Sequence, residues 1–140
     1  MANSPGQEAN VAVFREAIGE WTRGDRAAVV ATLTEDVEVL VPPELGNPGD
    51  YRGRRAFVEW TRQWYEAWSE FDLEIEAIEP VGEHHVIATI RSRGRGRGSG
   101  IEVENLIGWV LEVREGLCPF VSLQPSYEQA LDLARSREAI

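Results

Sequence analysis

Two stretches in the first half of the chain place apolar residues at helical spacing. The first runs from Val11 to Trp21, after which Asp25 can cap a short second helix over residues 26–33. Residues 1–7 lie outside this periodicity, and we expect them to form a flexible tail. The N-terminal part of the fold is therefore predicted to be helical.

The second helical stretch runs from about Arg55 to Ser69 and carries an aromatic stripe. Its members recur every three or four residues: Phe57, Trp60, Trp64 and Trp68. Such a stripe is typical of a helix face that packs against a sheet. It can also line a ligand cavity, and the two interpretations are compatible.

From Phe71 onward the apolar period changes to two, which is typical of half-buried strands. An isolated strand is predicted earlier, over residues 37–41. Later strands are expected over residues 71–77, 85–95, 101–115 and 117–123, before a short closing helix over residues 127–135. This order predicts a single α+β domain over residues 8–140, in which a curved antiparallel or mixed sheet wraps around the N-terminal helices.

An Arg-Gly run over residues 93–98 lies at the turn between two predicted strands. Runs of this kind occur in proteins that bind single-stranded nucleic acids. A turn centred near residues 98–99 pairs positions whose numbers sum to about 197, so Arg95 faces Glu102 and Arg93 faces Glu104. Two opposite-charge pairs from one register favour a β-hairpin instead.

The same register places Ser92 opposite Asn105 and Ala88 opposite Trp109 on the other face of the hairpin. That face is mostly apolar, so we expect the helices to cover it. Ser92 and Asn105 are then polar groups on a buried concave surface. They either hydrogen-bond to each other or orient a ligand.

Composition narrows the available chemistry. All 14 basic side chains are arginine, which excludes a lysine Schiff base and a P-loop lysine. The single cysteine, Cys118, excludes an internal disulfide and a multi-cysteine zinc site. The only histidines, His84 and His85, are adjacent beside a turn, where we expect them to be solvated. No metal and no cofactor is therefore predicted.

Together with the 14 arginines, the 24 acidic side chains give the chain a formal net charge of −10. This balance argues against nucleic acid and anionic membranes as partners. No apolar run reaches the roughly 18 residues that a membrane-spanning helix needs. The first residues also lack the basic and apolar segments of a signal peptide, so a cytoplasmic location is predicted.

The order and spacing of short motifs from about Val11 to Ala134 resemble the SnoaL-like branch of the nuclear-transport-factor-2-like superfamily. The motifs are Trp21–Asp25, Thr34–Glu38, Tyr51–Arg54, Gly96–Val103, Glu115-Gly116 and Tyr127–Leu131. The resemblance implies a cone-shaped α+β barrel with a deep cavity that opens at one end. It also implies a homodimer.

This superfamily includes polyketide cyclases, limonene-epoxide hydrolases and ketosteroid isomerases. The isomerase uses an aspartate base, with a tyrosine and a protonated aspartic acid as oxyanion donors. Alignment on Gly24-Asp25 places these three groups at Val41, Ala17 and Trp109, which are all apolar. Under this alignment the isomerase mechanism is absent. The inward positions predicted on the last two long strands carry no acid or histidine either, so the sequence places no catalytic group and leaves enzyme activity open.

The leading hypothesis is a pocket protein that binds a small hydrophobic molecule in an aromatic-lined cavity. The expected walls and ligand-orienting groups are Trp21, Trp60, Trp64 and Trp109, with Ser92, Asn105 and Tyr65. One alternative is an enzyme of the cyclase, isomerase or epoxide-hydrolase type, which an acid–base group on the cavity wall would indicate. Another is a dimeric association module without a ligand, which a filled interior would indicate.

Overall fold

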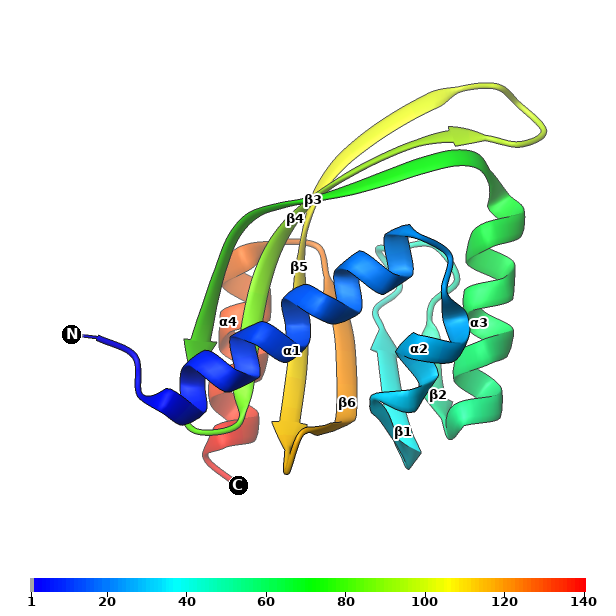
Figure 1. The fold of residues 1–140 in the computed structure, drawn as a ribbon. Coiled ribbons are helices and arrows are strands. Elements are labelled where there is room, and N and C mark those ends of the chain that lie inside the picture. The colour runs from blue at the N-terminus through cyan, green and yellow to red at the C-terminus, as the bar shows by residue number, and fades with distance from the viewer. Residues whose placement is uncertain (1) are drawn as a thin grey trace.

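The structure is a computed structural model that describes residues 2–140 (Figure 1). The elements in this range are α1 (Pro5–Thr22), α2 (Arg26–Ala31), β1 (Leu33–Val41), β2 (Gly49–Arg52), α3 (Arg54–Ala67), β3 (Trp68–Val81), β4 (His85–Gly96), β5 (Glu102–Arg114), β6 (Leu117–Gln124) and α4 (Tyr127–Glu138). The strands form one curved, unclosed sheet in the order β2-β1-β6-β5-β4-β3. Strands β1 and β6 are parallel and the other neighbours are antiparallel. The predicted α+β fold with a mixed sheet is confirmed.

Helix α1 begins earlier than the apolar pattern indicates. The Ser4 hydroxyl accepts a hydrogen bond from the Gln7 N–H, and the Gln7 side chain accepts one from the Ser4 N–H. This capping box starts the helix at Pro5, so residues 5–7 are helical and the predicted tail is wrong for them. Apolar periodicity missed this turn because its first inward residues come later, from about Val11.

Helices cover both faces of the sheet. Helices α1, α2 and α3 lie on the concave face, and α4 lies on the opposite face (Figure 1). The larger core fills the concave side, where Val86, Ala88 and Ile90 of β4 are fully buried. A smaller core lies under α4 and consists of Ile87, Val110, Phe120, Ala130 and Ala134. The central strands are thus apolar on both sides, as burial on both faces requires.

Strands β3, β4 and β5 extend beyond α1 and α2 as an arm, and β3 joins this arm to the end of α3 (Figure 1). Within it Arg95 pairs with Glu102 and Arg93 pairs with Glu104 across the strands, so the predicted hairpin and its register are confirmed. The Arg97 side chain donates to the carbonyl oxygens of Tyr65, Glu66 and Trp68 at the C-terminal end of α3. These donors satisfy carbonyl groups that a helix end leaves unpaired.

Strand β3 ends the sheet on the side opposite β2. Its exposed acidic residues are Glu70, Asp72, Glu74, Glu76 and Glu79. Its pairing with β4 shifts register between Ile75 and Ala77, as a β-bulge does. None of the helices in residues 2–140 is long and apolar enough to cross a membrane.

Gly108 of β5 lies tightly against the start of α4. A Cβ atom there would lie 2.7 Å from the Ser126 carbonyl oxygen and 2.8 Å from the Ala130 Cβ. Since backbone blocks the added atom, we expect Gly108→Ala to lower the free energy of unfolding by about 1–3 kcal/mol in urea denaturation. Gly98→Ala has open space around the new atom, so this control should change the free energy of unfolding by less than about 0.5 kcal/mol. Equal effects of the two changes would contradict this packing.

Candidate functional site

A group of aromatic rings fills the space between the helices and the concave face of the sheet. Trp21 of α1 lies at its centre and is 3% exposed. Its ring centroid lies 5.6–6.0 Å from those of Phe57, Trp60, Trp64, Tyr65 and Trp109. We call these six residues the aromatic cluster. The structure therefore brings together five of the seven residues predicted for the ligand pocket.

The cluster follows from local spacing on three elements. The stripe on α3 presents Trp60 and Trp64 to Trp21 of α1, and strand alternation turns Trp109 of β5 inward. The Tyr65 hydroxyl donates to the Trp21 carbonyl oxygen at 2.8 Å. Burial raises the pKa of Tyr65, so its hydroxyl stays protonated and donating at neutral pH.

A small cavity of about 30 Å³ lies beside the cluster. Its walls come from α1, α2, α3 and the sheet: Phe14, Ala17, Ile18, Trp21, Val29, Thr32, Leu33, Phe57, Trp60, Trp109, Leu111, Cys118 and Val121. This volume is about that of one water molecule, whereas ligand pockets span roughly 300–1,000 Å³. The described conformation therefore has a nearly filled interior.

The cavity wall carries no acid–base group among the residues that the structure describes. Its one titratable side chain is Cys118, and burial raises the pKa of this thiol to about 12. A protonated thiol is a poor nucleophile at neutral pH. Ala17 and Trp109, two of the positions aligned with the isomerase groups, line this cavity, and Val41 lies in the same core.

Four indole N–H groups of the cluster lack hydrogen-bond partners within residues 2–140. They are the buried Nε1 atoms of Trp21, Trp60, Trp64 and Trp109. A buried donor without a partner costs about 1–3 kcal/mol, and protein interiors rarely contain several of them together. The aromatic pattern of the sequence located these tryptophans, but only the packed structure shows that their donors are unsatisfied.

The sequence matches the model of one protein family. The model of the SnoaL-like domain matches residues 14–118, most of the chain. The chain belongs to the SnoaL-like domain family. The resemblance stated from the sequence motifs is thereby confirmed. No curated protein matches the sequence.

Solved structures share the fold of this SnoaL-like domain at low identity. A proposed SnoaL-like polyketide cyclase from Jannaschia sp. CCS1 has a TM-score of 0.79 at 17% identity, with 96% of each chain covered. TerC, co-crystallised with polyporic acid, has a TM-score of 0.74 at 13% identity, with 91% of this chain and 98% of TerC covered. A protein with a ketosteroid isomerase-like fold from Catenulispora acidiphila, in complex with trimethylamine, has a TM-score of 0.71 at 14% identity, with 88% of this chain and 92% of that chain covered.

The two predicted polar anchors of the SnoaL-like domain lie outside the cluster. Ser92 and Asn105 face each other in the predicted register, but Asn105 is exposed and Ser92 is half-buried. The prediction of a buried surface at these positions is wrong because the helices leave this part of the arm uncovered. Their side chains make no hydrogen bond to each other in the described part of the chain.

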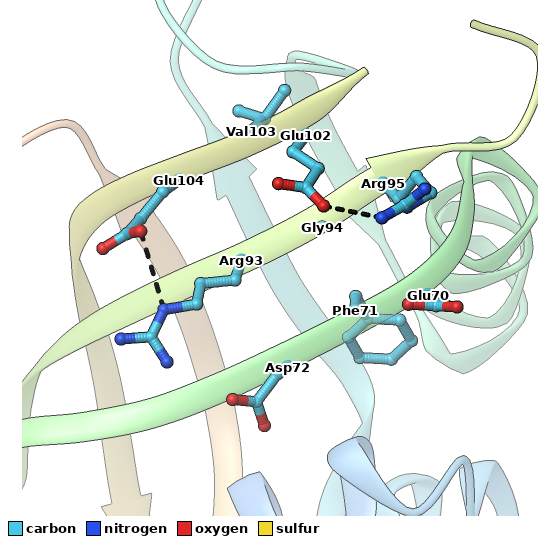
Figure 2. Close-up of a pocket in the computed structure, with 9 residues that line it drawn as sticks. All are labelled: Glu70, Phe71, Asp72, Arg93, Gly94, Arg95, Glu102, Val103 and Glu104. Carbon is cyan, nitrogen blue, oxygen red and sulfur yellow. Dashed lines mark hydrogen bonds and ion pairs between the residues drawn. The ribbon is translucent and has the colours of Figure 1, made fainter. Parts of the chain in front are cut away.

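A hollow of about 510 Å³ lies on the arm (Figure 2). Its lining residues are Glu70, Phe71, Asp72, Arg93, Gly94, Arg95, Glu102, Val103 and Glu104. Both arginines in it form ion pairs, Arg93 with Glu104 at 3.6 Å and Arg95 with Glu102 at 2.6 Å. The hollow is an open, charged groove whose basic groups are already engaged, which makes it a poor match for a hydrophobic molecule.

The two histidines of the SnoaL-like domain differ in environment. His84 is half-buried, but the His85 side chain is 0% exposed between the sheet and α4, so its predicted solvation is wrong. Its Nδ1 contacts the Glu138 carboxylate, and its Nε2 lies 3.2 Å from Glu112 without an aligned hydrogen bond. Residues two apart on a strand lie on the same face, and Ile87 of the same strand faces α4. The alternation of the strand could therefore have predicted the side on which His85 lies.

Glu112 joins this group to two arginines. It accepts hydrogen bonds from Arg114 Nε at 2.6 Å and from Arg137 Nη2 at 3.0 Å. We call His85, Glu112, Glu138, Arg114 and Arg137 the His85 network. The two carboxylates approach opposite nitrogens of one imidazole, so they join α4 to the sheet and do not converge as metal ligands.

Acid should weaken the His85 network. Burial alone would raise the pKa values of Glu112 and Glu138, but for Glu112 hydrogen bonds from the two arginines and the nearby His85 lower it. For Glu138, hydrogen bonds from His85 and from backbone N–H groups lower the pKa. Carboxyl groups with lowered native pKa values stabilise the fold fully above the ordinary pKa of 4.5, and this stabilisation is lost as pH falls through the native pKa.

We therefore expect the free energy of unfolding to decrease as the pH falls below about 4.5. Urea denaturation at several pH values measures this slope. Glu138→Gln should flatten it, because the amide has no proton to gain in this range. Identical slopes for the variant and the parent protein would show that Glu138 does not contribute to the acid sensitivity.

Proposed function

We propose that this SnoaL-like domain binds a small hydrophobic molecule within the aromatic cluster. The observation that carries the proposal is an apolar cavity walled by Trp21, Trp60 and Trp109 on the concave side of the sheet. TerC, which shares the fold, was co-crystallised with polyporic acid, which supports a ligand role for this type of fold.

Binding requires the cluster to open, because about 30 Å³ cannot hold a ring system. Helix α2 covers one side of the cavity with only six residues, of which Val29 is buried. We propose that α2 and the tryptophan side chains move apart as the ligand enters. Burial of the ligand's apolar surface, at about 25 cal/mol per Å², offsets the cost of this opening.

Binding is better supported than acid–base catalysis. A general base must lie within about 2.6–3.2 Å of the proton that it removes, or reach it through one water. Among the described residues, none with a carboxylate or an imidazole lines the cavity. Glu20 precedes Trp21, and burial and Glu16 raise its pKa, but it is not part of the cavity wall.

The nearly filled interior favours a second candidate function, an association module without a ligand. The family resemblance predicts a homodimer, and sedimentation velocity measures this state directly. A dimer that binds no probe would support the association module over the pocket protein. The cytoplasmic location stays a prediction from the sequence.

Tryptophan fluorescence and thermal unfolding with fluorene, limonene and decanoic acid test the proposed pocket. We expect at least one probe to change the emission and raise the Tm. Ala17→Leu, on the cavity wall, should weaken that binding roughly tenfold by overfilling the site. Ala27→Leu, on the exposed face of α2, is the matched control and should leave it unchanged. A flat response to all three probes would refute the pocket.

A further inference from the structure

The unpaired donors of the aromatic cluster carry information about the ligand. Trp21, Trp60 and Trp109 each have a buried indole N–H without a partner, and all three line the cavity. Each of these side chains is at least nine-tenths buried, with 2–4% exposure. An indole N–H donates and cannot accept, so the tryptophans supply donors alone to the wall.

Three hydroxyl groups close to the cluster donate hydrogen bonds to backbone carbonyl oxygens. Tyr65 donates to the Trp21 carbonyl oxygen, Thr61 to Val58, and Thr32 to Val29. Local backbone carbonyls therefore satisfy these three hydroxyls, while the indole donors remain unsatisfied. The contrast points to a function for these donors, because a core selected only for stability would pair them or replace them.

Contacts between the aromatic rings offset only part of the free-energy cost of burying indole N–H groups without partners. The Trp21 and Trp109 planes meet at 89°, and those of Trp21 and Trp64 at 71°. Edge-to-face packing of this kind is worth about 0.5–1.5 kcal/mol for each pair. A hydrogen bond from an N–H to a ring face is weaker than one to an oxygen, so an oxygen acceptor remains favourable.

We propose, on the basis of the binding function above, that the ligand is a ring compound with a carbonyl oxygen and that the unpaired indole N–H groups of the cavity wall, those of Trp60 and Trp109 among them, are the donors for this oxygen. A carbonyl oxygen has two lone pairs, so one atom can accept from two indoles. The cavity of about 30 Å³ has room for such an atom, while the hydrocarbon part of the ligand packs against the displaced rings.

Two probes of the same shape separate the carbonyl from the rest of the ligand. Fluorene and 9-fluorenone share one ring framework and differ in a CH₂ group and a C=O group. We expect 9-fluorenone to bind about 3- to 10-fold more tightly, as one or two net hydrogen bonds allow. Calorimetry gives the two dissociation constants, and indole ¹H–¹⁵N spectra show which N–H resonances move downfield.

Trp60→Phe and Trp109→Phe keep an aromatic ring and remove the donor. Each removes the same ring area for both probes, so each should weaken the binding of 9-fluorenone about 3- to 10-fold more than the binding of fluorene. Trp68→Phe is the control, because Trp68 is half-buried at the rim and does not line the cavity. Thermal unfolding of each variant verifies that it is folded before the affinities are compared.

The outcomes separate this inference from the proposed function. Equal affinities for the two probes, with equal losses in the phenylalanine variants, would overturn the carbonyl acceptor and leave the hydrophobic pocket standing. Absence of binding for both probes and for limonene and decanoic acid would overturn the pocket and the inference together. A selective loss of 9-fluorenone binding in the Trp60 and Trp109 variants would support both.

Discussion

Replacement of Trp21 by alanine should lower the free energy of unfolding by about 3–5 kcal/mol, the range found for large aromatic side chains in cores. Trp21 is 3% exposed and contacts rings from α3 and β5. Its removal leaves a cavity that neighbouring rings on fixed elements can fill only in part. Urea denaturation followed by far-ultraviolet circular dichroism measures the change independently of tryptophan emission.

Trp68→Ala provides the matched comparison for this loss. Trp68 is half-buried and packs against Trp64 at the end of the stripe, so its removal should cost clearly less than that of Trp21. Added indole should raise the Tm of the Trp21→Ala variant by occupying the new cavity. Equal costs for the two variants, or no effect of indole, would contradict a central role for Trp21.

Glu112→Ala should lower the free energy of unfolding by about 3 kcal/mol. This is the lower end of the cost of removing one partner from a buried ion pair, because Arg114 and Arg137 keep part of their side chains in water. The fully buried His85 cannot reach solvent in the same way. Urea denaturation at neutral pH measures the loss.

Glu102→Ala is the control for the removal of a carboxylate. Glu102 pairs with Arg95 at 2.6 Å, but its side chain is 74% exposed, so this change should cost no more than about 1 kcal/mol. A loss at Glu112 as small as that at Glu102 would mean that the network contributes little to the docking of α4.

The strand register was predictable because charge and apolar alternation act together. Only one alignment places Arg93 and Arg95 opposite acidic residues, and the same alignment puts Ala88 opposite Trp109 on the inner face. The aromatic stripe on α3 likewise located most of the candidate site. Periodicity identifies the face on which a side chain lies, and that is enough to bring these groups together.

Periodicity does not show how far one element covers another. Ser92 and Asn105 lie on the predicted inner face, but the helices leave this part of the arm uncovered. His85 is buried by α4, a helix that comes more than 40 residues later in the chain. The unpaired indole groups depend on side-chain rotation, which the order of residues does not determine.

The acidic residues and the bulge of β3 affect how copies of this domain meet in solution. Two molecules that joined through β3 would bring rows of carboxylates such as Glu70 and Asp72 close together, which is unfavourable for like charges on adjacent strands. The bulge near Ile75 also interrupts the regular edge that an incoming strand would need. The edge of β3 therefore disfavours the addition of a further strand, whether from a second copy of this domain or in an amyloid-like stack.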